Sequence, residues 1–176
     1  MTTRATRREF LGTAAAATAA MTWPRSRASA APAPQSSPNS TINLGLIGCG
    51  GEGRAVLQAH LKCPNTRVAG VCDVNQDRLA QGVRDTGDSA IPAYRDFREL
   101  LDNKDIDVVI VGTNDHWHCL CAVMACQAGK HVYVEKPLAT SIAEGRAVVS
   151  AARKYDRVVQ LGTQQRSWPH YQQAAE

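Results

Sequence analysis

The amino-acid sequence predicts an α/β fold built on a doubly wound parallel sheet. Three observations predict it. Short apolar runs alternate with helix-like stretches between residues 42 and 161, a glycine-rich turn joins the first run to the first helix, and residues 108–111 form an apolar run without polar alternation. Alternating strands and helices imply parallel pairing with right-handed crossovers. An unbroken apolar run is typical of a strand that is buried on both faces.

The first predicted strand, residues 42–47, leads directly into the turn Gly48-Cys49-Gly50-Gly51-Glu52-Gly53. A helix is predicted over residues 54–62, and a second strand over residues 68–72 ends in Asp73. A lone G-x-G-x-x-G is a weak signal. Strand, glycines, helix, strand and acid in this order form the pattern of a dinucleotide-binding unit.

Each glycine of this turn has a separate role in such a unit. Gly48 allows the tight turn, Gly50 lets the backbone approach a pyrophosphate, and Gly53 lets the helix pack close to the strand. Gly51 lies in the same turn, where free N–H groups and the positive end of the helix dipole face the pyrophosphate. Asp73 is placed to accept hydrogen bonds from the ribose hydroxyls.

The remaining elements continue the alternation. Residues 76–86 predict a polar helix, residues 87–92 a turn with a minimal strand near Ile91, and residues 96–101 a short helix with one apolar face. Further strands are predicted at residues 108–111, 131–134 and 158–161. Helices are predicted between them, over residues 118–128 and 141–155. The first ends at Gly129 and the second begins with the capping-box spacing of Ser141 and Glu144.

Residues 1–30 predict an export signal. Arg7 and Arg8 precede a weakly apolar run over residues 12–21, and residues 28–30 have an A-x-A cleavage pattern. Paired arginines before a mild apolar region resemble a twin-arginine signal peptide, so we expect export, to the periplasm or beyond, by the twin-arginine machinery. The alternative is a disordered basic N-terminus. Residues 31–41 predict a flexible linker.

The net charge of +4 arises in the same segment, because residues 1–30 hold five arginines and one glutamate. The other residues carry 15 basic and 15 acidic side chains, which gives no indication of a nucleic-acid partner. The apolar run is too short and too weakly apolar for a membrane span.

Six cysteines in an exported protein invite a disulfide interpretation. We expect them instead to pack as small apolar residues, because a twin-arginine substrate folds in the cytosol, where thiols stay reduced. Residues 116–121 (His-Trp-His-Cys-Leu-Cys) do not predict a metal site, because ligands at i and i+2 do not converge on one helix face. Trp117 is expected to form a wall of the cofactor or substrate cleft.

Glu135-Lys136-Pro137 follow the strand predicted over residues 131–134. The carboxyl ends of the strands are where doubly wound sheets bind ligands. A partly desolvated lysine there, next to a substrate hydroxyl, could polarise or deprotonate it. By chemistry alone, a solvated loop lysine remains the alternative.

Four segments together resemble the Gfo/Idh/MocA oxidoreductases. They are the glycine turn, Asp73, residues 112–118 (Gly-Thr-Asn-Asp-His-Trp-His) and residues 134–138 (Val-Glu-Lys-Pro-Leu). The resemblance extends over residues 42–166, and the E-K-P sequence is its most specific element. It implies a Rossmann domain that binds a nicotinamide cofactor.

The resemblance also implies roles for single residues. Lys136 would lie beside the nicotinamide and the reacting hydroxyl, as the catalytic residue, with Glu135 at the cofactor. Thr113, Asn114 and His118 would line the cofactor. Members of the family have a second α+β domain that supplies further catalytic residues, which here would lie beyond residue 176. We therefore expect this domain to be missing and residues 167–176 to begin a connection to it.

The cofactor is expected to be NAD rather than NADP. The carboxylate of Asp73 accepts hydrogen bonds from ribose hydroxyls and repels a 2′-phosphate. Val74 and Asn75 offer no compensating cation, and Arg78 is expected to point along the following helix.

These observations predict an oxidoreductase that transfers hydride between NAD and a sugar or polyol. Two alternatives stay open. One is an exported NAD-dependent glycoside hydrolase that works by transient oxidation and elimination, and the other is a nucleotide-binding domain without turnover. We expect a carbohydrate or polyol as substrate, and a homo-oligomer for a full-length protein.

Overall fold

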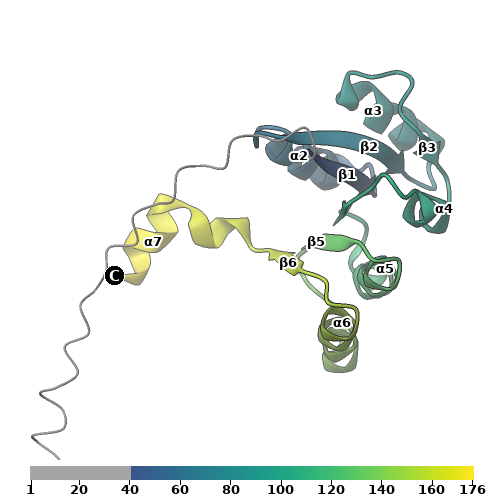
Figure 1. Cartoon of the computed structure of the whole chain (residues 1–176). Coiled ribbons are helices and arrows are strands. Elements are labelled where there is room, and N and C mark those ends of the chain that lie inside the picture. Colours follow the sequence, from purple (N-terminus) through teal and green to yellow (C-terminus); the bar gives the residue numbers. More distant parts are fainter. Residues whose placement is uncertain (1–40) are drawn as a thin grey trace, which may run out of the picture. The chain divides into compact units, whose positions relative to one another are not determined.

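The computed structural model describes residues 41–176. The predicted signal peptide and all of the predicted linker except Thr41 lie outside the described residues. A sheet of parallel strands forms the centre of the domain, in the order β3-β2-β1-β4-β5-β6 (Figure 1). The strands are β1 (Ile42–Ile47), β2 (Thr66–Cys72), β3 (Ala93–Tyr94), β4 (Val108–Val111), β5 (His131–Glu135) and β6 (Val159–Gly162). The predicted doubly wound sheet is confirmed.

The helices cover both faces of the sheet (Figure 1). They are α2 (Gly51–His60), α3 (Gln76–Thr86), α4 (Phe97–Asp102), α5 (Asp115–Gln127) and α6 (Ile142–Lys154). A 3₁₀ turn, η2 (Gln164–Ser167), and a short helix, α7 (Pro169–Ala175), follow β6. Within residues 41–176, no helix combines the length and the apolar character that crossing a bilayer requires.

The position of β4 in the sheet explains why its sequence shows no polar alternation. Val109 and Val111 are buried in the cluster that packs under α4, α5 and α6. Ile110, between them, is buried in the cluster under α2 and α3. Side chains alternate between the two faces of a strand, and here both faces are covered.

Local side-chain contacts set the ends of α3 and α6. Asn75 accepts a hydrogen bond from the backbone N–H of Arg78 at 3.1 Å at the start of α3, and Gly87, with φ of 74°, ends that helix. Ser141 caps α6 by accepting from the N–H of Glu144 at 3.3 Å. The Glu144 carboxylate accepts from the N–H of Thr140 at 2.8 Å, one residue before the position that a capping box predicts.

Several element boundaries differ from the sequence prediction by one to three residues. Helix α2 begins at Gly51 and α5 at Asp115, each three residues earlier than predicted. The first three residues of α2 (Gly-Glu-Gly) and of α5 (Asp-His-Trp) lack the apolar spacing on which the prediction relied. Strand β3 lies at Ala93–Tyr94 rather than near Ile91, because the N–H of Asp73 donates to the carbonyl of Tyr94 at 3.2 Å.

The cysteine side chains follow the packing prediction with one exception. Those of Cys49, Cys72, Cys121 and Cys126 are buried in the two core clusters. Cys63 is exposed after α2, so it does not pack as predicted.

Candidate functional site

The predicted site residues gather at the carboxyl ends of four neighbouring strands. The glycine turn follows β1 and Asp73 follows β2, while Thr113 and Lys136 follow β4 and β5. In an open parallel sheet, this edge at the reversal of strand order is where ligands bind.

Steric contacts explain the glycines at 48 and 53. Gly48 has φ of +93°, and a Cβ added there would lie 2.7 Å from the carbonyl carbon of Gly112. A Cβ on Gly53 would collide with the carbonyl oxygen of Gly48. A side chain at either position would force α2 away from the strand ends.

Gly50 and Gly51 have different surroundings. A Cβ added at either residue would meet no atom within 4 Å. The backbone at Gly50 is extended, with φ of −67° and ψ of 178°, and this residue precedes the first turn of α2. The turn therefore leaves open space in front of free helix N–H groups, which fits the pyrophosphate of a dinucleotide.

Asp73 is held in place by the backbone. Its Oδ2 accepts from the N–H of Cys49 at 2.8 Å, and its Oδ1 accepts from the N–H of Asn75 at 2.8 Å. The residue is 8% exposed. Each oxygen keeps a further lone pair for a ligand hydroxyl.

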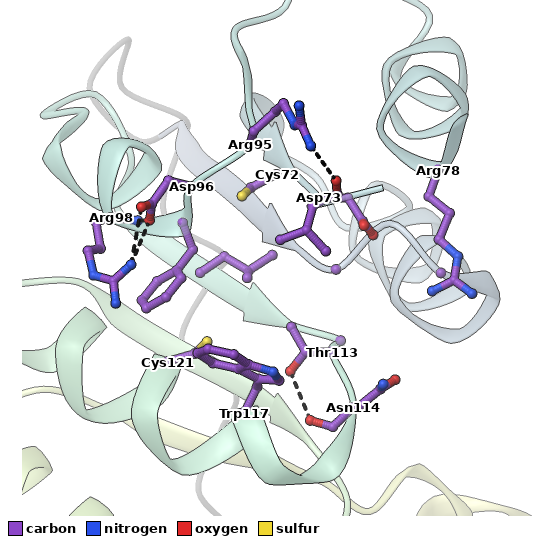
Figure 2. A pocket seen from close by; sticks show the side chains of 16 residues that line it. Cys72, Asp73, Arg78, Arg95, Asp96, Arg98, Thr113, Asn114, Trp117 and Cys121 are labelled. Atoms are coloured by element: carbon purple, nitrogen blue, oxygen red, sulfur yellow. Dashed lines mark hydrogen bonds and ion pairs between the residues drawn. The ribbon is translucent and has the colours of Figure 1, made fainter. Parts of the chain in front are cut away.

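A cavity of about 300 Å³ lies between Asp73 on one side and Trp117 on the other (Figure 2). Its lining residues come from the ends of β1, β2, β3 and β4, and several are charged. They are Ile47, Gly48, Gly50, Cys72, Asp73, Val74, Arg78, Arg95, Asp96, Phe97, Arg98, Gly112, Thr113, Asn114, Trp117 and Cys121.

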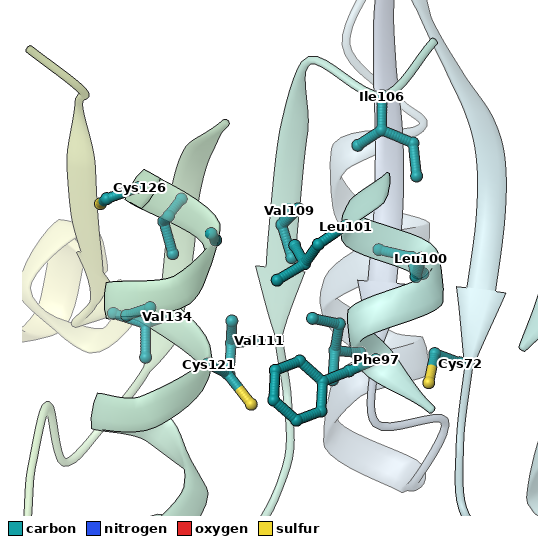
Figure 3. Close-up of a cluster of buried hydrophobic side chains, with 14 of the residues drawn as sticks. Cys72, Phe97, Leu100, Leu101, Ile106, Val109, Val111, Cys121, Cys126 and Val134 are labelled. Carbon is teal, nitrogen blue, oxygen red and sulfur yellow. The ribbon is translucent and has the colours of Figure 1, made fainter. Parts of the chain in front are cut away.

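The floor of this cavity is apolar. Phe97 and Trp117 meet edge to face, with ring centroids 6.2 Å apart. Cys72 and Cys121 lie at the floor and in the core beneath it (Figure 3). Burial raises the pKa of each of these thiols to about 12, so they stay protonated and unreactive. An apolar floor with an aromatic wall suits a flat base such as adenine.

A second cavity, of about 500 Å³, opens over the N-terminus of α2. It shares Gly50, Arg78 and residues 112–114 with the first cavity. Arg54 also lines it and is paired with Asp85 of α3 at 2.6 Å. The two cavities together form a trough from Asp73 past the glycine turn to Thr113 and Asn114.

The loops after β4 and β5 are joined by His118. This side chain is 1% exposed. Its Nδ1 lies 2.6 Å from the carbonyl oxygen of Pro137, and its Nε2 lies 3.1 Å from the carbonyl oxygen of Thr113. Thr113 and Asn114 line both cavities, whereas His118 lines neither. His118 was predicted to line the cofactor, but in the structure it lies behind Thr113 and outside both cavities.

Glu135 and Lys136 differ in exposure. Glu135 is 3% exposed. It accepts from the Lys136 N–H at 3.2 Å and from the Tyr133 hydroxyl at 3.4 Å. Burial, followed by the charge of Glu135, raises the pKa of Tyr133. Lys136 is exposed in the loop after β5, and neither residue lines the two cavities.

Sequence reasoning missed the arginines of the first cavity. Arg95 and Arg98 follow β3, and Arg78 lines both cavities instead of pointing only along α3 as predicted. A hint was available, because the loop after a third parallel strand also ends at the ligand-binding edge. Within residues 41–176, no three His, Cys, Asp or Glu side chains are grouped so as to hold a metal ion.

Comparisons with known proteins agree with this geometry. A family model described as an oxidoreductase family with an NAD-binding Rossmann fold (GFO_IDH_MocA) matches residues 42–163. The chain is 35% identical over 126 residues to a glycosyl hydrolase family 109 protein of Saccharopolyspora erythraea, covering 68% of this chain and 28% of that protein. It is 34% identical over 131 residues to an inositol 2-dehydrogenase of Salmonella typhimurium, covering 72% of this chain and 38% of the other.

A solved structure is similar as well. The structure of a levoglucosan dehydrogenase in complex with NADH and levoglucosan has a TM-score of 0.65 and 30% identity, and the match covers 72% of this chain and 36% of the other. The chain thus spans about a third of the length of the proteins it matches.

Proposed function

Since this chain belongs to the oxidoreductase family with an NAD-binding Rossmann fold, we propose that it is the cofactor domain of an NAD-dependent oxidoreductase that acts on a sugar or polyol. The observation that carries the proposal is the trough at the carboxyl edge. It begins at a fixed carboxylate, passes an open glycine turn at a helix N-terminus, and reaches Thr113 and Asn114 after β4.

The residues present fit NAD. Asp73 would accept hydrogen bonds from the adenosine ribose, and the cavity floor would hold the adenine. The open space at Gly50 and Gly51 would admit the pyrophosphate. Thr113 and Asn114 would line the trough further along.

NAD supplies a hydride acceptor for a carbon that bears a hydroxyl. The protein's own residues would orient that hydroxyl and move its proton. Lys136 extends from the loop after β5 and is the candidate for contacting the substrate oxygen. Glu135, buried beside it, and His118, which holds the Pro137 carbonyl, would fix the loop that carries this lysine.

A second function has a specific observation in its favour. The relative with 35% identity is a glycosyl hydrolase family 109 protein. The alternative is therefore glycoside hydrolysis by transient oxidation, which makes a neighbouring C–H more acidic, followed by elimination and return of the hydride. Such a cycle leaves no net redox change, which suits a cofactor carried through export by a folded protein.

Two measurements test the proposal. Calorimetric titration of NAD into the purified chain should show one site, and the absence of binding would refute a cofactor domain. Product analysis on a full-length protein that carries this domain then distinguishes the two activities. A stable keto-sugar supports the oxidoreductase, whereas a released sugar at its original oxidation level supports the hydrolase.

The cellular setting is part of the same proposal. The paired arginines and the A-x-A pattern of residues 1–30 support export to the periplasm or beyond by the twin-arginine machinery. A homo-oligomer is proposed for the full-length protein, and size-exclusion chromatography with light scattering tests it.

A further inference from the structure

Three charged side chains line the first cavity around its adenosine end. Figure 2 shows Asp73 between Arg95, which reaches in from the loop after β3, and Arg78, which extends from α3. Both arginines are exposed, so their guanidinium groups can move toward a ligand. Asp73 is buried and fixed by two backbone hydrogen bonds of 2.8 Å.

The other arginines of the trough are already paired. Arg98 contacts Asp96 at 3.1 Å, and Arg54 contacts Asp85 at 2.6 Å. Within residues 41–176, neither Arg78 nor Arg95 has a carboxylate oxygen within 4.0 Å. Arg95 donates to the Val74 carbonyl oxygen at 3.2 Å, which leaves most of its donors for a ligand.

A pair of guanidinium groups beside an adenosine ribose is a suitable binding site for a phosphate monoester on that ribose. Arginine presents several N–H donors in a planar fork that matches phosphate geometry, and its charge does not depend on pH in the neutral range. The sequence suggested that no cation lies near Asp73, and this was one reason to exclude NADP. In the structure, Arg78 and Arg95 line the same cavity as Asp73.

We propose that Arg78 and Arg95 form a clamp for the 2′-phosphate of an adenosine nucleotide, and that Asp73 opposes its use, since the other carboxylate that lines this cavity, Asp96, is already paired with Arg98. The proposal rests on the assignment of this trough as the cofactor site. In this proposal, the fixed carboxylate of Asp73 causes the preference for NAD over NADP. Removing that carboxylate, with no cation added, reverses the preference to the 2′-phosphorylated nucleotide.

The test uses two fragments, 5′-AMP and adenosine 2′,5′-bisphosphate, titrated calorimetrically into the full chain. These probes occupy only the adenosine end and need neither nicotinamide nor turnover. The variants are Asp73→Asn, Asp73→Ser, Arg78→Gln and Arg95→Gln, alone and with each Asp73 change combined with each arginine change. Arg84→Gln is the matched control, because Arg84 is exposed on the same helix but lines neither cavity.

In the unmodified chain, 5′-AMP should bind more tightly than the bisphosphate. Either Asp73 variant should reverse this order, with a change in the affinity ratio of roughly 30-fold, since a like charge beside a phosphate is removed. Arg78→Gln and Arg95→Gln should each weaken bisphosphate binding roughly tenfold, the effect of losing a charged hydrogen bond. They should weaken 5′-AMP binding less than bisphosphate binding, and Arg84→Gln should change neither nucleotide.

The possible outcomes distinguish a failure of the arginine clamp from a failure of the proposed cofactor site. If 5′-AMP binds but the arginine variants leave bisphosphate affinity unchanged, the clamp is refuted and the cofactor site stands. If neither nucleotide binds the unmodified chain, the proposed function fails and the clamp fails with it. Should the Asp73 variants unfold, as a melting scan would show, the two arginine variants in the unmodified background decide the question alone.

Discussion

Gly50 and Gly53 stand in one turn, yet a side chain added at each meets different surroundings. The space beside Gly50 is empty within 4 Å, whereas the space beside Gly53 is filled by the Gly48 carbonyl. The first position is therefore open to a ligand and the second is closed by the fold. Two substitutions separate these roles.

Gly50→Val should abolish NAD binding and leave the fold intact. The extended backbone at residue 50 is compatible with valine, and its side chain would occupy the space proposed for the pyrophosphate. Calorimetry should show an affinity loss on the order of 100-fold or more, with little change in the melting temperature. Normal NAD binding by this variant would show that the turn is not the phosphate site.

Gly53→Ala should instead destabilise the domain, because its Cβ meets backbone atoms that cannot move independently. We expect a loss of about 2 kcal/mol or more in the free energy of unfolding, measured by urea denaturation. Gly145→Ala on α6 is the matched control, since a Cβ there meets no atom within 4 Å. Equal stability of the two variants would contradict the close packing of α2.

Lys136 is the residue on which the proposed chemistry depends. In a full-length protein that carries this domain, Lys136→Ala should lower kcat roughly 10²–10⁴-fold, the usual effect of losing a positioned acid or base. NAD affinity should change little, because Lys136 lines neither cavity. Lys136→Met removes the ammonium and keeps the stem. Near-normal kcat in both variants would make this lysine a bystander.

At the scale of elements, α2 and α3 are tied together above the glycine turn. Arg54 of α2 contacts Asp85 of α3 at 2.6 Å, and Gln81 donates to the same carboxylate at 2.7 Å. The hydrogen bond from Gln81, together with Arg54, lowers the pKa of Asp85. Because both helices border the second cavity, this pair also fixes the width of the trough.

Asp85→Asn should cost about 0.5–1 kcal/mol of unfolding free energy at neutral pH, the range for a partly exposed pair. The folded-state pKa of Asp85 lies below its unfolded value. Its contribution is therefore complete above the unfolded pKa of about 4 and is lost as the pH falls through the folded pKa. Urea titrations at several pH values should show the difference from the parent shrinking in acid. Asp105→Asn, in an exposed loop, should show no such difference.

Sequence patterns predicted the elements that carry their own signals. The helix at residues 76–86 and the strand at residues 108–111 match the structure, because caps, glycine and apolar runs are local features. Strand β3 was predicted near Ile91 instead of Ala93–Tyr94, because it has only two residues and its position is fixed by its bonds to β2. The first turn of α5 was missed because its first three residues have no apolar spacing.

The candidate site was likewise predicted only in part from the sequence. The glycine turn and Asp73 could be predicted because both belong to one βαβ unit, whose residues follow one another in the sequence. Arg95 reaches the cavity only because β3 lies beside β2 in the sheet, which the sequence does not state. The burial of His118 between two carbonyl groups likewise depends on the neighbouring loops after β4 and β5.

At the scale of the whole molecule, the export proposal depends on residues outside the described part of the chain. Replacing Arg7 and Arg8 with lysine should retain the protein in the cytoplasm as an uncleaved precursor, because the twin-arginine route reads the arginine pair. Fractionation and immunoblotting of the precursor and the mature form measure the result. Replacing Arg25 and Arg27 with lysine is the charge-matched control. Normal export of the first variant would remove the basis for an extracytoplasmic function.

The interlocked glycines at residues 48, 53 and 112 have an evolutionary consequence. A Cβ on Gly48 meets Gly112, one on Gly53 meets Gly48, and one on Gly112 lies 2.5 Å from the Cα of Gly53. Each position restricts change at another, so every single replacement of these glycines passes through a destabilised intermediate. Lineages descending from this sequence are free to drift at residues 50 and 51 if they abandon the ligand. At the other three positions, packing favours glycine whether or not the ligand is kept.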